Sequence, residues 1–253
     1  MTLLRFSQIE QKLYAPETDG RLAPDTGVGD LLQVVRPGDQ GHPPTELIDY
    51  VSAALNSVPS DKPVVFMVHG FDFNPLDDPA AEPGDTDNPH GRLFHFGADD
   101  PEAHAISWPR RFGFAENDAG AEGLAIAFGW NSDTKPYHLD AYNQGTGASW
   151  GLIAILAAIR HVQPNRRVEI VAHSLGTHVT LNLLRVLASN QHVRALLPGI
   201  HRIVLMGGAE FVYHARQTYR VLETILDASG QSLLNHLHIY NFISREDEVV
   251  SVI

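Results

Sequence analysis

Short apolar runs alternate with longer amphipathic patterns along most of this chain, and this alternation restricts its fold more than any other feature. Runs that are apolar at nearly every position are typical of strands covered on both faces of a sheet. Helical periodicity occupies the stretches between them. The pattern predicts an α/β fold, with a mostly parallel central sheet and helices on both faces. The expected strands are residues 63–69, 124–130, 167–172, 203–206 and 238–243, and the expected helices are residues 46–58, 149–162 and 177–189.

Composition excludes several classes of protein. The chain has 253 residues, of which 43% are hydrophobic and 19% charged, so residues 1–253 can bury the core of a single domain. A net charge of -12 without clustered Lys and Arg argues against nucleic acid and anionic membranes as partners. We expect no transmembrane segment, because no apolar run is long enough to span a membrane. We expect a cytoplasmic protein, because residues 1–13 lack the apolar core of a secretion signal. Cysteine is absent, which excludes disulfides and a cysteine nucleophile.

Two regions do not follow the alternation. Residues 15–44 are rich in Gly, Pro and Asp, with one edge strand expected at residues 31–35. Residues 72–123 form a long insertion with little periodicity, and such loops are usually functional or disordered. Its aromatic side chains predict a lid with an apolar inner face, although packing onto the main core explains them equally well. They are Phe94, Phe96, Trp108, Phe112 and Phe114.

The insertion also contains possible metal ligands. Imidazole and carboxylate groups suit Zn²⁺ or Ca²⁺, but their spacing here is irregular and matches no defined motif. A solvated acidic loop is the favoured interpretation, and we expect neither a metal nor another cofactor. The residues concerned are His90, His95, Asp99, Asp100 and His104.

One segment indicates chemistry. A predicted strand is followed by Ala172-His173-Ser174-Leu175-Gly176 and then by a predicted helix. Small residues two positions before and after a serine allow the sharp turn of a nucleophile elbow, which lifts the serine hydroxyl above the sheet edge. At a helix N-terminus the backbone also favours a developing oxyanion. Ser174 is therefore the predicted nucleophile, the alternative being a serine that only caps the following helix.

A second turn follows the first long strand, at His69-Gly70-Phe71. In this order, the His-Gly turn and the serine elbow resemble those of the α/β-hydrolase superfamily, the serine esterases and lipases. The resemblance implies that the backbone N–H groups of Phe71 and Leu175 form an oxyanion hole. It also implies that His69 holds the turn and is not the catalytic base.

A looser resemblance involves residues 128–140. A Trp-x-Ser turn, Trp130-Asn131-Ser132, precedes a Tyr-x-x-Asp pair, Tyr137 and Asp140. This arrangement is similar to that in one poorly characterised branch of the superfamily.

A catalytic triad also needs an acid and a base. The acid should follow a late strand, and Asp247 fits this position, with Glu210 after the preceding strand as the alternative. Glu246 and Glu248 fit a solvated charge run. The superfamily takes its histidine from a loop after one further strand, which the 253 residues do not contain.

None of the fourteen histidines stands where the superfamily's chain order requires it. His138 and His214 follow strand ends but do not match that order. We expect the histidine beyond Ile253; the alternatives are an unusual source, or a base that has been lost. The sequence thus predicts a serine hydrolase acting on small carboxylic esters through an acyl-serine. The alternative is a catalytically impaired binding or scaffold protein.

Overall fold

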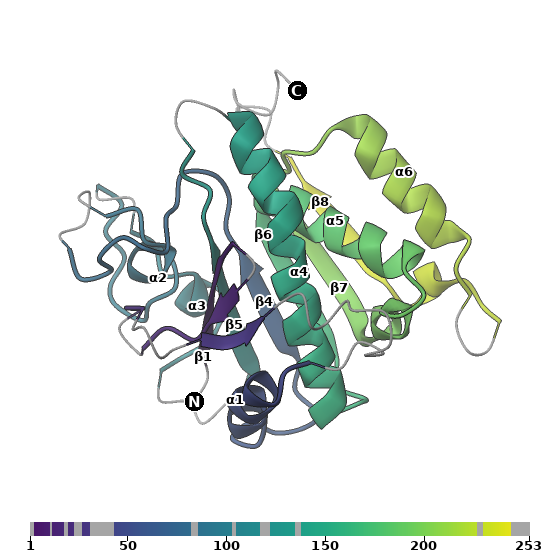
Figure 1. Ribbon diagram of the computed structural model, residues 1–253, viewed down its shortest axis with the longest axis horizontal. Helices are drawn as coiled ribbons and strands as arrows, with labels where there is room; N and C mark the ends of the chain where they lie inside the picture. The colour runs from purple at the N-terminus through teal and green to yellow at the C-terminus, as the bar shows by residue number, and fades with distance from the viewer. Residues whose placement is uncertain are drawn as a thin grey trace.

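A twisted β-sheet lies at the centre of the molecule and carries helices on both faces (Figure 1). The computed structural model describes residues 3–10, 12–17, 20–22, 27–30, 43–81, 86–102, 105–116, 122–134, 138–226 and 230–243. Within these ranges the strands are β1 (Leu3–Ile9), β2 (Lys12–Tyr14), β3 (Gly27–Asp30), β4 (Val64–Val68), β5 (Leu124–Trp130), β6 (Val168–His173), β7 (Ile200–Met206) and β8 (His238–Phe242). The α-helices are α1 (Thr45–Leu55), α2 (Pro89–Arg92), α3 (Trp108–Arg111), α4 (His138–Val162), α5 (Gly176–Ser189) and α6 (Val212–Glu223), with 3-10 helices at Arg194–Gly199 and Leu233–Asn235.

The strand order places the carboxyl ends of the central strands side by side. The described sheet runs β3-β2-β1-β5-β4-β6-β7-β8. The neighbouring pairs β1-β5, β5-β4, β4-β6, β6-β7 and β7-β8 are parallel. Strand β2 is antiparallel to both β1 and β3. The chain passes from β4 outward to β5 and then returns to β6 on the other side of β4. Sites of α/β proteins lie at such a reversal, beyond the carboxyl ends of the strands.

The two faces of the sheet are covered by different parts of the chain. Side chains alternate along β4, so that Val64, Phe66 and Val68 join one core while Val65 and Met67 join another. The first core contains residues of α1, α4, α5 and α6. The second is closed by the described part of residues 72–123, the segment between β4 and β5 that the sequence predicts to be an insertion, with the short helices α2 and α3.

The expected fold class is confirmed, including most of its elements. The five predicted strands, β4 to β8, and the helices α1 and α5 lie within a few residues of their predicted bounds. Helix α4 begins at His138, whereas its predicted start is residue 149. The predicted start is too late because Gly145 and Gly147 interrupt the apolar pattern of the first turns. The edge strand expected at residues 31–35 lies outside the described residues.

Strand β1 and helix α6 were not predicted from the sequence. Gln8 breaks the apolar run of β1, yet its side chain is buried. Burial of this polar group is possible because its amide donates to the Gly147 carbonyl and accepts from the Gly151 N–H of α4. Of the residues of α6, only Thr218 and Leu222 are buried. Its apolar residues lie on one face, but half of its side chains are polar, and the prediction did not include this helix. None of the described helices combines the length and the apolar character that crossing a membrane requires.

Candidate active site

Ser174 occupies the turn between β6 and α5 in a strained backbone conformation. Its φ of 51° is left-handed, a conformation that costs a non-glycine residue about 1–3 kcal/mol and persists only where the surrounding structure holds it. Small neighbours make the turn possible. A Cβ added at Gly70 would lie 2.7 Å from the Ser174 Cβ, and one at Gly176 would lie 2.5 Å from the His69 carbonyl oxygen. The structure thus places Ser174 in the geometry that a nucleophile elbow requires.

Backbone hydrogen bonds from two directions hold Ser174. Its N–H donates to the Met206 carbonyl at the end of β7 (2.9 Å). Its own carbonyl accepts from Thr177 in α5 (3.0 Å) and from Ala209 in the loop after β7 (3.1 Å). The strained turn therefore depends on the β7 loop as well as on its own helix.

His69 is a buried structural residue at the end of β4. Its Nε2 accepts from the Trp130 backbone N–H (3.0 Å), so the proton is on Nδ1, which donates to the Gly70 carbonyl (2.9 Å). The Trp130 indole N–H also donates to the His69 carbonyl (3.2 Å). Burial lowers the pKa of His69 to about 3, against a weaker upward effect of the bond to Gly70. This imidazole is neutral and has both nitrogens occupied, which agrees with the role that the superfamily resemblance implies for it.

Ser132 fastens the same turn from the end of β5. Its hydroxyl donates to the Gly70 carbonyl (2.9 Å) and accepts from the Phe73 N–H (3.0 Å). Phe71 lies between these two anchored residues. The Trp-x-Ser sequence after β5 thus has a physical function here, since Trp130 and Ser132 fix the loop that would supply an oxyanion donor.

The two predicted oxyanion donors lie beside Ser174. Leu175 follows Ser174 directly, and in the part of the chain that the structure describes its N–H donates no backbone bond. Phe71 lines the same cavity as Ser174. Their joint action on an oxyanion stays a prediction.

An apolar cavity of about 600 Å³ opens at Ser174. Its walls come from the β4 turn, the insertion and the end of β7, and Arg111 is its one charged lining residue among those described. His173 also faces it and meets the Trp108 ring edge to face, with centroids 6.1 Å apart. The apolar lining residues are Phe71, Phe73, Leu93, Ile106, Trp108, Phe112 and Met206. The cavity suits an apolar group placed next to the serine hydroxyl.

The insertion is tied to the body of the protein at several points. Arg5 of β1 donates to the Phe94 carbonyl (3.1 Å), and Phe94 is fully buried in the second core. The Ser7 hydroxyl of β1 also meets His90 Nε2 (2.8 Å), and the Ser132 N–H donates to the Phe73 carbonyl (2.8 Å). The bond from Arg111 Nε to Asp99 Oδ2 (2.9 Å) joins residues within the insertion. Packing on the main core, one of the two interpretations of its aromatic residues, is therefore present. Movement as a lid stays a prediction for residues 72–123.

The two candidate acids differ in their placement. Asp247, like Glu246 and Glu248, lies outside the described residues. Glu210 lies after β7, where its carboxylate is almost fully buried, with 6% of the side chain exposed. It accepts from His178 Nδ1 (2.9 Å), the Tyr142 hydroxyl (2.6 Å) and the Phe211 N–H (2.7 Å).

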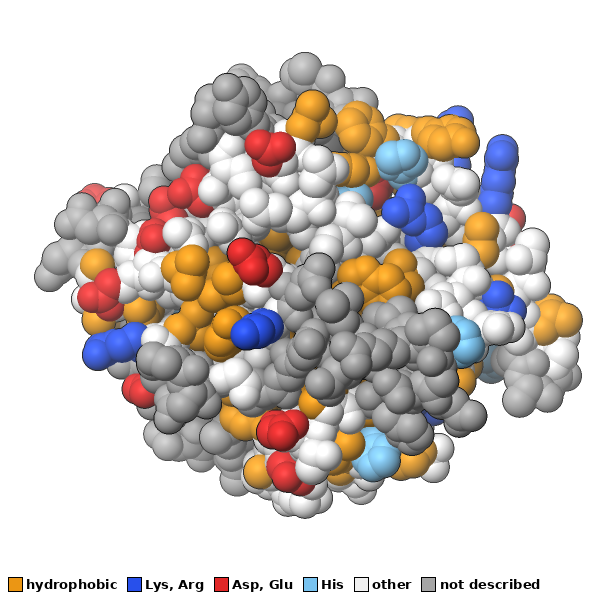
Figure 2. All heavy atoms as spheres, in the orientation of Figure 1, with side chains coloured by type: hydrophobic (Ala, Val, Ile, Leu, Met, Phe, Trp, Pro, Cys, Tyr) orange, Lys and Arg blue, Asp and Glu red, His pale blue; other side chains and the backbone are white. Residues whose placement is uncertain are grey.

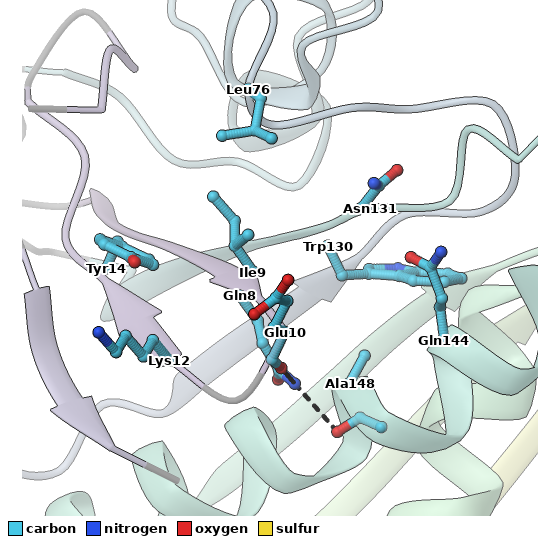
Figure 3. A pocket seen from close by; sticks show the side chains of 11 residues that line it. Gln8, Ile9, Glu10, Lys12, Tyr14, Leu76, Trp130, Asn131, Gln144 and Ala148 are labelled. Carbon is cyan, nitrogen blue, oxygen red and sulfur yellow. Dashed lines mark hydrogen bonds between the residues drawn. The ribbon is translucent and has the colours of Figure 1, made fainter.

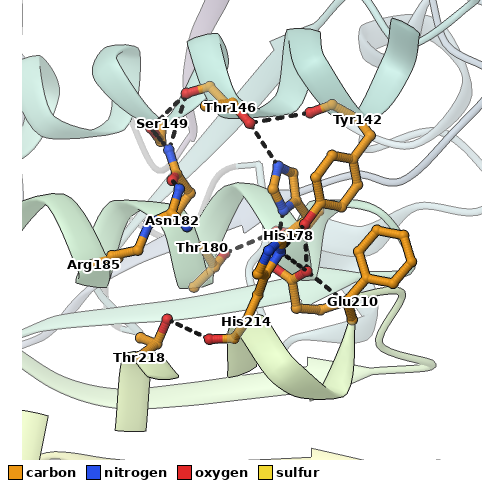
Figure 4. Close-up of polar contacts among 12 residues, drawn as sticks. Tyr142, Thr146, Ser149, His178, Thr180, Asn182, Arg185, Glu210, His214 and Thr218 are labelled. Carbon is orange, nitrogen blue, oxygen red and sulfur yellow. Dashed lines mark hydrogen bonds and ion pairs between the residues drawn. The ribbon is translucent and has the colours of Figure 1, made fainter. Parts of the chain in front are cut away.

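These contacts decide the charges in the Glu210 cluster (Figure 4). Burial alone would raise the pKa of Glu210, but the hydrogen bonds from His178 and Tyr142 outweigh it and lower the pKa below its usual value. Burial and the bond to Glu210 raise the pKa of Tyr142. Sequence reasoning missed this cluster, because no local motif joins residues from α4, α5 and the β7 loop.

The other histidines supply no metal site among the described residues. No group of three or more potential metal ligands gathers among the described residues. His104 lies outside those residues. His90 Nε2 meets the Ser7 hydroxyl (2.8 Å) in the interior, and burial lowers its pKa far below the usual range. Asp99 is engaged by Arg111. His138 begins α4 and His214 lies in the first turn of α6, where its Nδ1 is 2.8 Å from the Tyr142 hydroxyl.

A larger cavity, of about 1010 Å³, lies beyond the carboxyl ends of β1 and β5 (Figure 3). Its lining is mixed, with Glu10, Lys12 and Gln144 alongside Ile9 and Leu76. It contains none of the residues of the elbow or the β4 turn. The smaller cavity is therefore the candidate active site, because only that one contains Ser174.

Comparison with known families agrees with the fold. None of the curated proteins matches the chain. A family described as "Alpha/beta hydrolase of unknown function (DUF900)" matches residues 105–252, which include the elbow, Trp130 and Ser132 but not the β4 turn. This match covers more than half of the 253 residues. The chain therefore belongs to DUF900, a family of alpha/beta hydrolases whose function is unknown.

Proposed function

We propose that this protein is a serine hydrolase that cleaves carboxylic esters through an acyl-serine intermediate. The observation that carries the proposal is the strained Ser174 turn, with φ 51°, opening onto an apolar cavity of about 600 Å³. Strain of this kind persists where the surrounding structure holds it, and it concentrates at active sites. A serine that only capped α5 would need neither the left-handed turn nor the cavity.

The chemistry follows the serine esterase scheme. Ser174 Oγ attacks the ester carbonyl carbon while its proton passes to an imidazole that Asp247 orients. The Phe71 and Leu175 N–H groups receive the oxyanion, and two such donors contribute several kcal/mol to transition-state stabilisation. The tetrahedral intermediate then breaks its bond to the alcohol, which leaves with the imidazolium proton. Water attacks the acyl-serine with help from the same base and releases the carboxylic acid.

The cavity favours esters with an apolar acyl part. Trp108, Phe112 and Ile106 of the insertion line the same cavity as Ser174, so the insertion supplies walls that an acyl chain would contact. Apolar contact contributes about 0.8 kcal/mol for each buried methylene. In this proposal residues 72–123 act as the substrate-binding insertion, with lid movement as part of the same hypothesis.

Substitution of the nucleophile tests the proposal. Ser174→Ala should abolish hydrolysis of p-nitrophenyl butyrate while thermal unfolding and the circular dichroism spectrum stay as in the wild type. Ser189→Ala, at the exposed far end of the same helix, is the matched control and should keep full activity. Equal turnover by the wild type and Ser174→Ala would show that Ser174 is not the nucleophile.

Non-catalytic binding on the same fold is a second candidate function. It is favoured by one observation: among the described residues, no histidine makes a hydrogen bond to Ser174 Oγ. A binding protein would take up an apolar ester in the cavity and release it unchanged. Isothermal titration with such an ester, followed by product analysis, separates the two functions.

A further inference from the structure

The loop after β7 connects the Ser174 turn to a buried ionic cluster. The Ala209 N–H bonds the Ser174 carbonyl (3.1 Å), and the next residue in the chain is Glu210. The Glu210 carboxylate reaches α5 through His178, one helical turn after Ser174, and reaches α4 through Tyr142. Three elements are thus joined at one carboxylate, and the loop that holds the nucleophile begins beside it.

The hydrogen atoms in the cluster can be assigned from its donors and acceptors. The carboxylate only accepts, so the Tyr142 hydroxyl donates to it and His214 Nδ1 must donate to the Tyr142 oxygen (2.8 Å). His178 Nδ1 likewise donates to Glu210, while its Nε2 meets the Thr146 hydroxyl (2.9 Å). Each group therefore has a directed partner, which fixes the orientation of the carboxylate.

Aromatic rings shield the cluster from water. The Tyr142 and His178 rings stack with centroids 3.6 Å apart, and Phe211 meets Tyr142 edge to face at 5.3 Å. His178 is 2% exposed. Hydrophobic side chains are exposed at the top of the molecule in Figure 2, the side on which α6 begins in Figure 1. The exposed hydrophobic residues include Phe211, Val212 and Tyr213. Hydrogen bonds to a carboxylate in such surroundings are stronger than in water.

We propose that Glu210 is a positioning residue: it locks the β7 loop to His178 and Tyr142 and thereby holds Ser174 in its reactive turn. The proposal rests on the proposed function for its kinetic consequences. It also assigns Glu210 a role other than that of the triad acid, since the carboxylate is already occupied by the Tyr142 hydroxyl and the His178 and Phe211 N–H groups.

Kinetics of Glu210→Gln distinguish positioning from acid catalysis. A displaced nucleophile should lower kcat for p-nitrophenyl butyrate about 10- to 100-fold, with KM within about twofold of the wild type. Loss of a triad acid would instead cost about 10⁴-fold in kcat. A loss of that size in Glu210→Gln, with Asp247→Asn fully active, would overturn the proposal, as would full activity of Glu210→Gln.

Substitutions at His178 supply a conservative rescue. The Asn amide nitrogen occupies nearly the position of the imidazole Nδ1, so His178→Asn should still donate to Glu210 and keep near wild-type kcat. His178→Leu removes the donor and should behave like Glu210→Gln. Glu210→Gln and His178→Leu break the same interaction, so the double variant that combines them should have a kcat no lower than that of either single variant. Additive losses, or equal losses in His178→Asn and His178→Leu, would contradict the proposal.

Ser149→Ala is the matched control for lost polar contacts between α4 and α5. Ser149 accepts from Asn182 (2.7 Å) within the same helix interface but does not touch Glu210 or its loop. This variant should lose stability while its kcat stays unchanged. A fall in kcat equal to that of Glu210→Gln would mean that loosening this interface, and not Glu210, is responsible.

Hydrogen exchange tests the proposal without reference to activity. The amide hydrogens of residues 172–180 should exchange faster in Glu210→Gln and His178→Leu than in the wild type, and should not change in Ser149→Ala. Wild-type protein that hydrolyses no ester would disprove the proposed function but leave this comparison intact. Unchanged exchange at the elbow in Glu210→Gln would disprove the positioning role.

Discussion

The strained conformation of Ser174 depends on the absence of side chains around it. Gly70 lets the β4 turn approach Ser174, and Gly176 lets the start of α5 approach the end of β4, in both cases too closely for a Cβ atom to fit. At Gly176 the obstructing atoms are the His69 and Val68 carbonyl oxygens, which belong to the backbone and cannot rotate away. The Ser174 turn is thus determined by steric contacts that extend into the neighbouring strand.

Replacement of Gly176 tests this steric account. The Cβ of Gly176→Ala would lie 2.5 Å from the His69 oxygen, so the variant should lose about 1–3 kcal/mol of unfolding free energy in urea denaturation. Gly147→Ala is the matched control, because a Cβ there meets no atom within 4 Å. That helical substitution should gain about 0.5–1 kcal/mol. An unfolding free energy of Gly176→Ala equal to that of the wild type would show that the turn can accommodate a Cβ at this position.

At the scale of elements, the insertion covers a face of the sheet that long helices leave open. Leu93, Phe94 and Phe114 pack against Val65, Met67 and neighbouring side chains, so the insertion contributes to the core as well as to the cavity. Trp108 belongs to both, since its ring meets the Phe94 ring edge to face (5.8 Å) and also lines the cavity. Acyl selectivity and stability should therefore separate between residues that line the cavity and residues that only pack.

Trp108 and Phe96 provide that separation. Trp108→Ala removes a wall of the cavity and should lower kcat/KM for p-nitrophenyl hexanoate about tenfold relative to the acetate ester. Phe96 packs in the same core without lining that cavity, so Phe96→Ala should reduce stability and leave the ratio unchanged. Measuring both esters with both variants checks this. Equal changes of the ratio would mean that the insertion affects substrates only through its overall stability.

At the scale of the whole molecule, the sequence predicted what depends on local periodicity and on one short motif. Strand β5 is buried along its whole length and its sequence is continuously apolar, so its bounds follow from the hydrophobic pattern. The elbow combines a strand, a small-residue motif and a helix, and the structure places Ser174 at that turn. The partners of Ser132 were not predicted, but the Trp-x-Ser motif indicated the right segment.

Features that depend on distant residues could not be predicted in this way. The Glu210 cluster joins residues separated by 32 to 72 positions, and each of its members alone has the pattern of an ordinary polar helix or loop residue. Gln8 likewise interrupted the pattern of β1, although α4 satisfies its amide. Long-range polar contacts are specified by the folded arrangement, whereas periodicity reports only which face of an element is buried.

Covalent labelling of Ser174 tests the central claim most directly. A fluorophosphonate forms a bond to an activated serine oxygen as fluoride leaves, and intact mass spectrometry with peptide mapping locates the adduct. We predict one adduct on the peptide that contains Ser174, lost in Ser174→Ala and retained in Ser189→Ala. A wild-type protein that takes no adduct, or an adduct that persists in Ser174→Ala, would contradict the account.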